Sequence, residues 1–440
     1  MRAAGSRMPA PSVARLRAAV TALFLLDGAV FGTWASRVPD VAAQVGADHS
    51  RLGIALLCLS MGALVCMRLT GALCARFGPG PVSAAAAVAV SASAVLPGLV
   101  SGIAALCAAL FVFGAATGMI NVSANAVGVQ VEARIGRPIL SGLHAGFSFG
   151  GLAGALVGGA ASSVLGVAPH LVLVAAGGFF LSAWALPVLA AADRAPVGSP
   201  EPGGAREEVQ RRFPRAVLVV LGAIAGCTAF GEGALTDWGA LLLREHLAAP
   251  ATLAAAGYGG FSLAMALGRL FGSRLLLAWG ERRLLVGGTL LAAAGALAAV
   301  TTSSIWVALV GFVVVGLGLA NVFPLAIARA GLIGGAPGIA LATTVGYTGL
   351  LGGPPAIGLL AEQAGLPVAV GSVAVLALVA GFLVLTVSGE RVRIPPLRTL
   401  LDRAVATVGG RLQPVVSGFG HGTGVYVLDL QALIPDPSGR

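Results

Sequence analysis

Lysine is absent from this chain of 440 residues, so all 27 basic side chains are arginine, and charged residues make up only 10% of the total. A soluble globular domain carries roughly 25% charged residues. Hydrophobic residues account for 57% of the chain. This imbalance excludes an ordinary soluble fold and predicts a protein that lies in a membrane.

Cysteine is scarce as well, with five residues, no CxxC pair and no metal-ligand spacing. A disulfide framework, a redox centre and a bound metal are therefore not expected. The chain also lacks a Walker A motif and a Ser/His/Asp constellation. ATP hydrolysis, membrane hydrolase chemistry and a cofactor are not expected, so the chain is predicted not to be an enzyme.

Long apolar runs are what the chain has in abundance. A helix needs about 20 apolar residues to cross the hydrocarbon core, and only helices and closed barrels satisfy their backbone polar groups in lipid. The runs are continuous rather than alternating, which favours helices. They predict twelve spans: 16–38, 51–76, 81–100, 103–131, 139–164, 168–191, 215–243, 252–279, 283–302, 305–331, 338–363 and 366–388.

The arginines indicate the orientation of these spans. If the N-terminus lies in the cytoplasm, only Arg37, Arg51 and Arg244 fall on the outer side. This is the positive-inside bias of multi-pass proteins. We therefore expect a cytoplasmic (inner) membrane protein with both termini in the cytoplasm. The net charge of +10 could suggest a nucleic-acid partner, but the arginines are distributed by membrane side. We therefore expect contact with the lipid bilayer and no nucleic-acid partner.

One polar segment divides the chain. Residues 192–214 carry Pro, Gly, Arg and Glu and are expected to be a cytoplasmic linker between six spans in 16–191 and six in 215–388. Residues 1–15 are expected to form a cytoplasmic N-terminal segment. Residues 389–440 contain no spanning run and are expected to form a largely disordered cytoplasmic tail.

The two halves repeat one another. Residues 118–122 (GMINV) in the fourth span correspond to 318–322 (GLANV) in the tenth, at an offset of 200 residues. Residues 27–34 in the first span, from an acid to a tryptophan, correspond to 232–238 in the seventh. Matches in the same order at nearly constant offset predict two bundles related by a pseudo-twofold axis.

Two parallel six-helix repeats are the architecture of major facilitator transporters. The chain resembles that superfamily over residues 16–388. Residues 71–78 (GALCARFG) resemble its loop motif, Gly-x-Leu-x-Asp-Arg-x-Gly, with Ala75 in place of the acid. The resemblance implies an all-α membrane protein in which twelve transmembrane helices form two six-helix pseudo-symmetric bundles, the major facilitator fold.

The same motif supplies candidates for gating. They are Gly71, Arg76 and Gly78 of the motif, together with Arg68 and Arg269, which lie near the cytoplasmic ends of the second and eighth spans. Structural anchoring is the alternative role for the two deeper arginines.

Further phrases narrow the resemblance. Residues 27–37 (DGAVFGTWASR), 141–151 (SGLHAGFSFGG) and 346–358 (GYTGLLGGPPAIG) look like a bacterial branch close to the fucose-permease-like sugar:proton symporters. This resemblance implies a transporter with a sugar as a candidate solute, and it implies a proton-linked acid in the first helix, where Asp27 is the match. The family also has an acid in the fourth helix, where this chain has Asn121 and Asn125 instead.

Three acids at membrane depth are candidates for proton coupling: Asp27, Glu232 and Asp237. An ionisable side chain there costs about 2.5–3.5 kcal/mol, so it needs a reason to be present. Desolvation favours the neutral form of a carboxyl group, which suits a proton carrier. A structural acid paired with a nearby polar or basic group is the alternative. Arg37 and Arg244 are expected to snorkel to the interface.

Amides and aromatic rings are candidates for the substrate cavity. Asn121, Asn125 and Asn321 lie inside the fourth and tenth spans, where helix–helix hydrogen bonding is the alternative role. The aromatic rings that could pack against a sugar in this cavity are Trp34, Trp238, Phe149 and Tyr347. The two tryptophans could equally belong to an interfacial belt.

These observations predict a monomeric, proton-coupled secondary transporter that moves a small polar solute by alternating access. A drug or metabolite exporter driven by proton antiport is the first alternative. A membrane receptor without transport activity is the second, and it would not need carboxylates along a central path.

Overall fold

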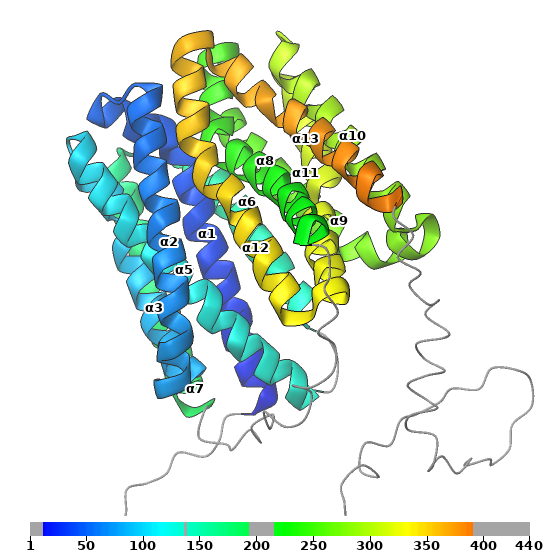
Figure 1. Cartoon of the computed structure of the whole chain (residues 1–440). Coiled ribbons are helices and arrows are strands. Elements are labelled where there is room, and N and C mark those ends of the chain that lie inside the picture. Colours follow the sequence, from blue (N-terminus) through cyan, green and yellow to red (C-terminus); the bar gives the residue numbers. More distant parts are fainter. Residues whose placement is uncertain (1–11, 136–138, 193–214, 390–440) are drawn as a thin grey trace, which may run out of the picture. The chain divides into compact units, whose positions relative to one another are not determined.

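The computed structural model describes residues 12–135, 139–192 and 215–389, and every element in these residues is a helix. The helices of the first half, shown in Figure 1, are α1 (Val13–Val45), α2 (His49–Phe77), α3 (Pro79–Ser93), α4 (Leu96–Leu99), α5 (Ile103–Ile135), α6 (Leu140–Ala161) and α7 (Val167–Ala192). Those of the second half are α8 (Arg215–Leu247), α9 (Ala251–Trp279), α10 (Glu281–Thr301), α11 (Ile305–Leu319), α12 (Val322–Ala364) and α13 (Leu366–Gly389). The predicted linker and tail lie almost wholly outside the described residues.

Local sequence signals set the ends of these helices. The carboxylate of Asp48 caps α2 by accepting a hydrogen bond of 2.8 Å from the backbone N–H of Arg51. Gly46 ends α1 in the left-handed conformation, at φ 62°, which glycine adopts without strain. Only three residues separate α1 from α2. Such short connections force successive helices to run antiparallel, as membrane crossings must.

The predicted internal repeat is visible in the packing. In the first bundle, α1 packs against α6 and α2 against α5; in the second, α8 packs against α12 and α9 against α11. Gly78, before α3, and Gly280, before α10, occupy equivalent joints and have nearly the same positive φ, 87° and 77°. The two bundles are therefore α1–α7 and α8–α13, as the sequence repeat predicts.

Glycines allow the paired helices to approach closely. A Cβ on Gly28 or Gly32 of α1 would collide with backbone carbonyl groups of α6. In the second bundle, a Cβ on Gly349 of α12 would collide with the backbone of Gly226 in α8. Small residues at helix interfaces bring backbones together in membrane proteins. The same device thus holds equivalent helix pairs in both halves.

Eleven helical stretches are long and apolar enough to cross a membrane. The remaining predicted span, 338–363, is the second half of α12, where glycine, threonine and proline lower the hydropathy. The bounds of α12 include this span, yet a Cβ on Gly338 would collide with the carbonyl oxygen of Ala330 in the same helix. Eight residues of straight helix would separate these positions by about 12 Å. The chain therefore turns back here, and the twelve-helix, two-bundle architecture is confirmed.

Candidate functional site

A cavity of about 430 Å³ lies between the two bundles. Its walls come from α1, α2, α5 and α6 on one side and from α8, α9 and α12 on the other. The lining residues of the first bundle are Phe24, Asp27, Phe31, Leu59, Ser60, Ala63, Met67, Thr117, Gly118, Asn121, His144, Phe147 and Ser148. Those of the second bundle are Ala229, Glu232, Gly233, Thr236, Asp237, Tyr258, Phe261, Ser262, Met265, Arg269, Phe323, Tyr347 and Leu350.

All three predicted acids line this cavity. Asp27 of α1 is 7% exposed, and its Oδ1 is buried without a hydrogen-bond partner in the described structure. Asp237 of α8 is 8% exposed. Among the described residues, neither carboxylate forms an ion pair. The cavity therefore holds one unpaired acid from each bundle.

Glu232 differs from the other two acids because it has a cationic partner. Its Oε2 accepts a hydrogen bond from Nη2 of Arg269 at 3.3 Å. Nε of the same guanidinium donates to the carbonyl oxygen of Ala320, also at 3.3 Å. Both members of the pair belong to the second bundle, on α8 and α9. Arg269 therefore pairs with an acid of its own bundle, and this pair does not bridge the two bundles.

Two hydroxyl groups of α9 face the first bundle across the cavity. A Cβ on Gly151 of α6 would lie 3.4 Å from both the Tyr258 hydroxyl and the Ser262 hydroxyl. Tyr258 lies within electrostatic reach of Asp27, Glu232 and Asp237. Sequence reasoning did not find Tyr258 or Ser262. Their signal was a polar residue pair one helical turn apart in an otherwise apolar span.

The three asparagines have different environments. Asn121 lines the cavity, whereas Asn125 donates a hydrogen bond of 2.8 Å to the backbone oxygen of Asn121 and is not part of the lining. Asn321 lies at the junction of α11 and α12 and donates to the Gly268 oxygen at 2.9 Å. Of the three cavity predictions, the structure places only Asn121 on the wall. Asn321 instead ties α9 to the α11–α12 junction.

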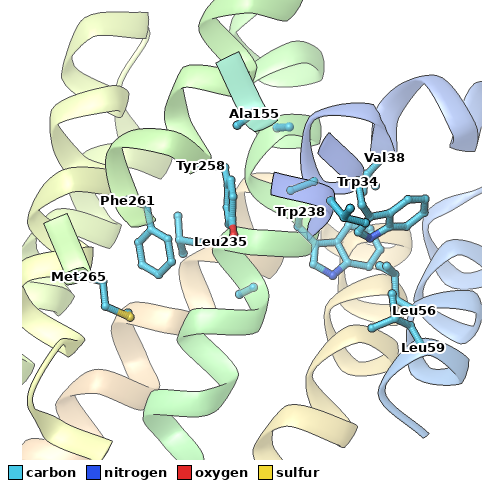
Figure 2. Packing of buried hydrophobic residues seen from close by; sticks show 14 of the residues in the cluster. Trp34, Val38, Leu56, Leu59, Ala155, Leu235, Trp238, Tyr258, Phe261 and Met265 are labelled. Atoms are coloured by element: carbon cyan, nitrogen blue, oxygen red, sulfur yellow. The ribbon is translucent and has the colours of Figure 1, made fainter. Parts of the chain in front are cut away.

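The aromatic predictions are corrected at three of four positions. Trp34 and Trp238 are 2% and 0% exposed and belong to the buried apolar cluster shown in Figure 2 rather than to the cavity wall or an interfacial belt. Phe149 is 50% exposed and does not line the cavity. Phe147 lies on the cavity face of α6 instead, and Tyr347 is on the wall as predicted.

The motif residues lie away from the cavity. Arg76 stacks over the ring of Phe77 at 5.1 Å, and Arg68 is exposed beside the lining residue Met67. A Cβ on Gly71 would meet open space. Gly78 has a positive φ that a side chain would strain. Within the described residues, Arg68 and Arg76 form no ion pair, so a gating role for them stays a prediction.

We call the side on which α7 ends and α8 begins the linker side, and the opposite side the far side. At the far side, Asp40 of α1 binds Arg244 of α8 and also Arg37, one turn earlier on its own helix. Nε2 of His49, at the start of α2, lies 2.9 Å from Oε2 of Glu245 on α8. The Asp40–Arg244 and His49–Glu245 contacts therefore both join the two bundles at the far side.

The predicted snorkelling of Arg37 is wrong. The residue is 1% exposed, and its guanidinium is surrounded by polar partners of the first bundle. Nε donates to Nδ1 of His170 at 3.1 Å, Nη1 to Asp40 at 2.9 Å, and Nη2 to the Leu165 oxygen at 3.0 Å. A buried guanidinium needs such compensation. Arg37 thereby holds Asp40 in position for Arg244.

Helix contacts between the bundles also gather at the far side. Gly159 of α6 packs against Ala251 and Ala255 at the start of α9. A Cβ on Gly53, near the start of α2, would lie 2.7 Å from the backbone oxygen of Pro354 in α12. A Cβ on Gly358 of α12 would collide with the backbone oxygen of His49. The cavity is therefore closed off at the far side by both backbone packing and ion pairs.

No side-chain cluster suited to a metal appears in the described part of the chain: no three His, Cys, Asp or Glu residues converge. The polar groups of the cavity are instead carboxylates, hydroxyls, one amide, one imidazole and one guanidinium. Such a wall can bind a solute and carry a proton.

Comparisons with known proteins agree with this arrangement. No family model matches the chain. An uncharacterised MFS-type transporter of Yersinia pestis is 36% identical over 358 residues, which cover 81% of this chain and 91% of the relative. An uncharacterised transporter of Sinorhizobium fredii is 33% identical over 355 residues, covering 78% and 91%.

A solved structure shows the same fold at low identity. A crystal structure of a mutant of the nucleoside transporter NupG superimposes with a TM-score of 0.69 at 12% identity, and the match covers 84% of this chain and 99% of that one. The homologues are transporters and not enzymes. By its identity to the Yersinia pestis relative and its fold, the chain belongs to the major facilitator superfamily of membrane transporters.

Proposed function

We propose that this protein is a proton-coupled secondary transporter that moves a small polar solute by alternating access. The observation that carries the proposal is Asp27, an acid on the cavity wall with a buried, unpartnered Oδ1 and no cation beside it in the described structure. A carboxylate removed from water needs an opposite charge or takes up a proton. Asp27 is therefore our proton carrier.

The two-bundle arrangement supports alternating access. The cavity lies between bundles that are built as rigid repeats, and it is closed at the far side by contacts that join them. Rocking of one bundle against the other around a central site is how this fold exchanges access. With the linker side assigned to the cytoplasm by the arginine bias, the present state faces inward. We therefore propose that the protein is a monomer that carries solute and protons together across the inner membrane into the cell.

Glu232 is assigned a structural role beside Asp27. Its ion pair with Arg269 neutralises both groups on one wall of the cavity. A neutral pair can stay in place through a cycle, whereas an unpaired acid can gain and lose a proton. Asp237 has no ion pair in the described structure and remains the alternative proton carrier.

The test is solute accumulation in vesicles. Right-side-out and inverted vesicles are given a panel of labelled sugars, with and without a pH gradient. Asp27→Asn should abolish proton-driven accumulation but keep exchange of solute, because asparagine resembles the protonated acid. Glu232→Gln should have a smaller effect. If Asp27→Asn accumulates solute as well as the parent does, Asp27 is not the carrier; accumulation driven only in inverted vesicles would favour an exporter.

A further inference from the structure

The cavity has an unequal charge. It contains three carboxylates, Asp27, Glu232 and Asp237, and one guanidinium, Arg269. The charge of Arg269 is already balanced by Glu232, so the guanidinium does not offset the other two carboxylates. Asp27 and Asp237 remain without a counter-charge among the described residues, and both are more than nine-tenths buried. The site therefore disfavours anions and leaves room for a cation.

Two hydroxyl groups of the cavity wall add to its hydrogen-bond acceptors. The hydroxyl of Thr117 donates to the backbone carbonyl oxygen of Gly114 at 2.9 Å. The hydroxyl of Thr236 donates to the backbone carbonyl oxygen of Glu232 at 2.7 Å. A hydroxyl has one proton to donate and two lone pairs. Since both protons are engaged by the helices, these hydroxyls can only accept from a solute. A hydrogen-bond donor on the solute would match these two hydroxyls.

The two unpaired acids are not equivalent. Oδ1 of Asp27 is sealed from the cavity surface and has no partner, so a proton fits it better than a bulky group does. Asp237, on the opposite bundle, has no such sealed and unpartnered oxygen in the described structure. Aromatic rings of Phe147, Phe323 and Tyr347 line the same space, and the face of an aromatic ring attracts a cation.

We propose that the transported solute is a small hydrophilic amine, such as an amino sugar, bound as its ammonium by Asp237 while Asp27 carries the coupled proton. An ammonium supplies a positive charge and three donors to a cavity whose wall includes the unpaired carboxylate of Asp237. Its charge-assisted hydrogen bonds to a carboxylate are the strong kind. The inference rests on the proposed function and adds the chemical class of the solute.

The test compares hydrophilic amines with neutral, acidic and lipophilic solutes. Purified full-length protein in detergent is given glucosamine, glucose, N-acetylglucosamine and glucuronate, then ethanolamine, glycerol and the lipophilic cation ethidium, and binding is measured by calorimetry. We expect binding by at least one hydrophilic amine and at least about tenfold weaker binding of its neutral and acidic counterparts. Preference for a neutral, acidic or lipophilic member, or no binding by any hydrophilic amine, overturns the proposal.

Variants locate the ammonium. Asp237→Asn should weaken amine binding by at least about tenfold, whereas Asp237→Glu should keep the preference for amine over neutral solute. Asp27→Asn should bind the amine but lose solute-driven proton movement in proteoliposomes. Amine binding that survives Asp237→Asn in a folded protein, checked by size exclusion, overturns the assignment.

The two proposals fail in different ways. A neutral sugar accumulated with protons would overturn the amine assignment and leave proton coupling standing. An amine that binds through Asp237 without any proton movement would support the amine assignment and overturn the proposed coupling.

Discussion

Arg244 of α8 binds Asp40 of α1, two residues 204 positions apart in the chain, and this ion pair joins the bundles at the far side. Arg37 binds the same carboxylate from within the first bundle. Asp40 thus has one permanent partner and one partner that bundle separation would remove. This division of roles allows the contact between bundles to be tested apart from the stability of either bundle.

Arg244→Gln should open the far side. The variant removes the bridge while leaving Arg37 and Asp40 paired, so the fold should lose little stability. A partly exposed ion pair contributes about 1 kcal/mol or less, which corresponds to a shift of up to about fivefold in the population open at the far side. The measurement is the rate at which an impermeant maleimide labels Ser60→Cys from the far side in a cysteine-free background. Arg51→Gln is the control, because among the described residues Arg51 forms an ion pair with Asp48 alone, at the start of its own helix. Equal rates in both variants would contradict the prediction.

Arg37→Met should act on stability instead. Its guanidinium is buried and bonded to Asp40, His170 and the Leu165 oxygen, all within the first bundle. Removing it leaves buried acceptors without their donor, at a cost of about 2–4 kcal/mol. The melting temperature in detergent should fall well below that of Arg244→Gln. A variant as stable as the parent would show that this network is not structural.

Two glycines distinguish packing between bundles from packing within one. A methyl group on Gly358 would press on His49 of the other bundle, so Gly358→Ala should hold the far side apart and raise far-side labelling of Ser60→Cys. Gly114→Ala would press on Leu59 in the same bundle and should cost about 1–3 kcal/mol of stability. Comparison of labelling rates and melting temperatures checks both effects. Gly358→Ala with a lower melting temperature and unchanged labelling would refute the distinction.

Asn121 and Asn321 should respond differently to alanine despite their equivalent places in the repeat. Asn121→Ala removes an amide from the cavity wall and should weaken binding of the transported solute several-fold. Asn321→Ala removes the hydrogen bond to the Gly268 oxygen and should cost about 1 kcal/mol of stability without weakening that binding. Calorimetry and thermal unfolding measure the two effects; loss of binding in Asn321→Ala alone would reverse the assignment.

The arginine bias predicts which side of the membrane each loop occupies. Ser199→Cys, in the linker outside the described residues, should not be labelled by an impermeant reagent in intact cells. Ser303→Cys, between α10 and α11 at the far side, should be labelled readily. Lysed cells supply the control in which both sites react. The opposite pattern in intact cells would invert the proposed orientation.

Sequence reasoning reached the features that are local or repeated. The spans follow from runs of apolar residues, and the position of Asp27 and Glu232 on one cavity follows from the repeat that relates α1 to α8. Joints such as Gly78 and Gly280 match in conformation because the sequence repeats around them. The fold could be predicted because its determinants lie within single helices.

The features that escaped prediction depend on partners far away in sequence or on the rotation of a helix. Arg244 looked like an interfacial arginine because its partner, Asp40, lies 204 residues away in the other bundle. Phe149 and Phe147 are two residues apart, about 200° around a helix, so they lie on nearly opposite faces, and the apolar sequence around them does not say which face borders the cavity. The pairing of Asn321 with a backbone oxygen of α9 carries no sequence signal of its own.

Asp27 and Asp40 lie on one uninterrupted helix, α1 (Val13–Val45). Thirteen residues of helix place them about 20 Å apart along its axis. The close packing of Gly28 and Gly32 on α6 grips α1 between these two positions. A tilt of α1 about that contact would displace Asp40 much further than Asp27, because Asp27 lies directly beside Gly28. One helix therefore carries both an acid of the cavity wall and the acid that joins the bundles at the far side, so a single movement of α1 reaches both ends of the transport path.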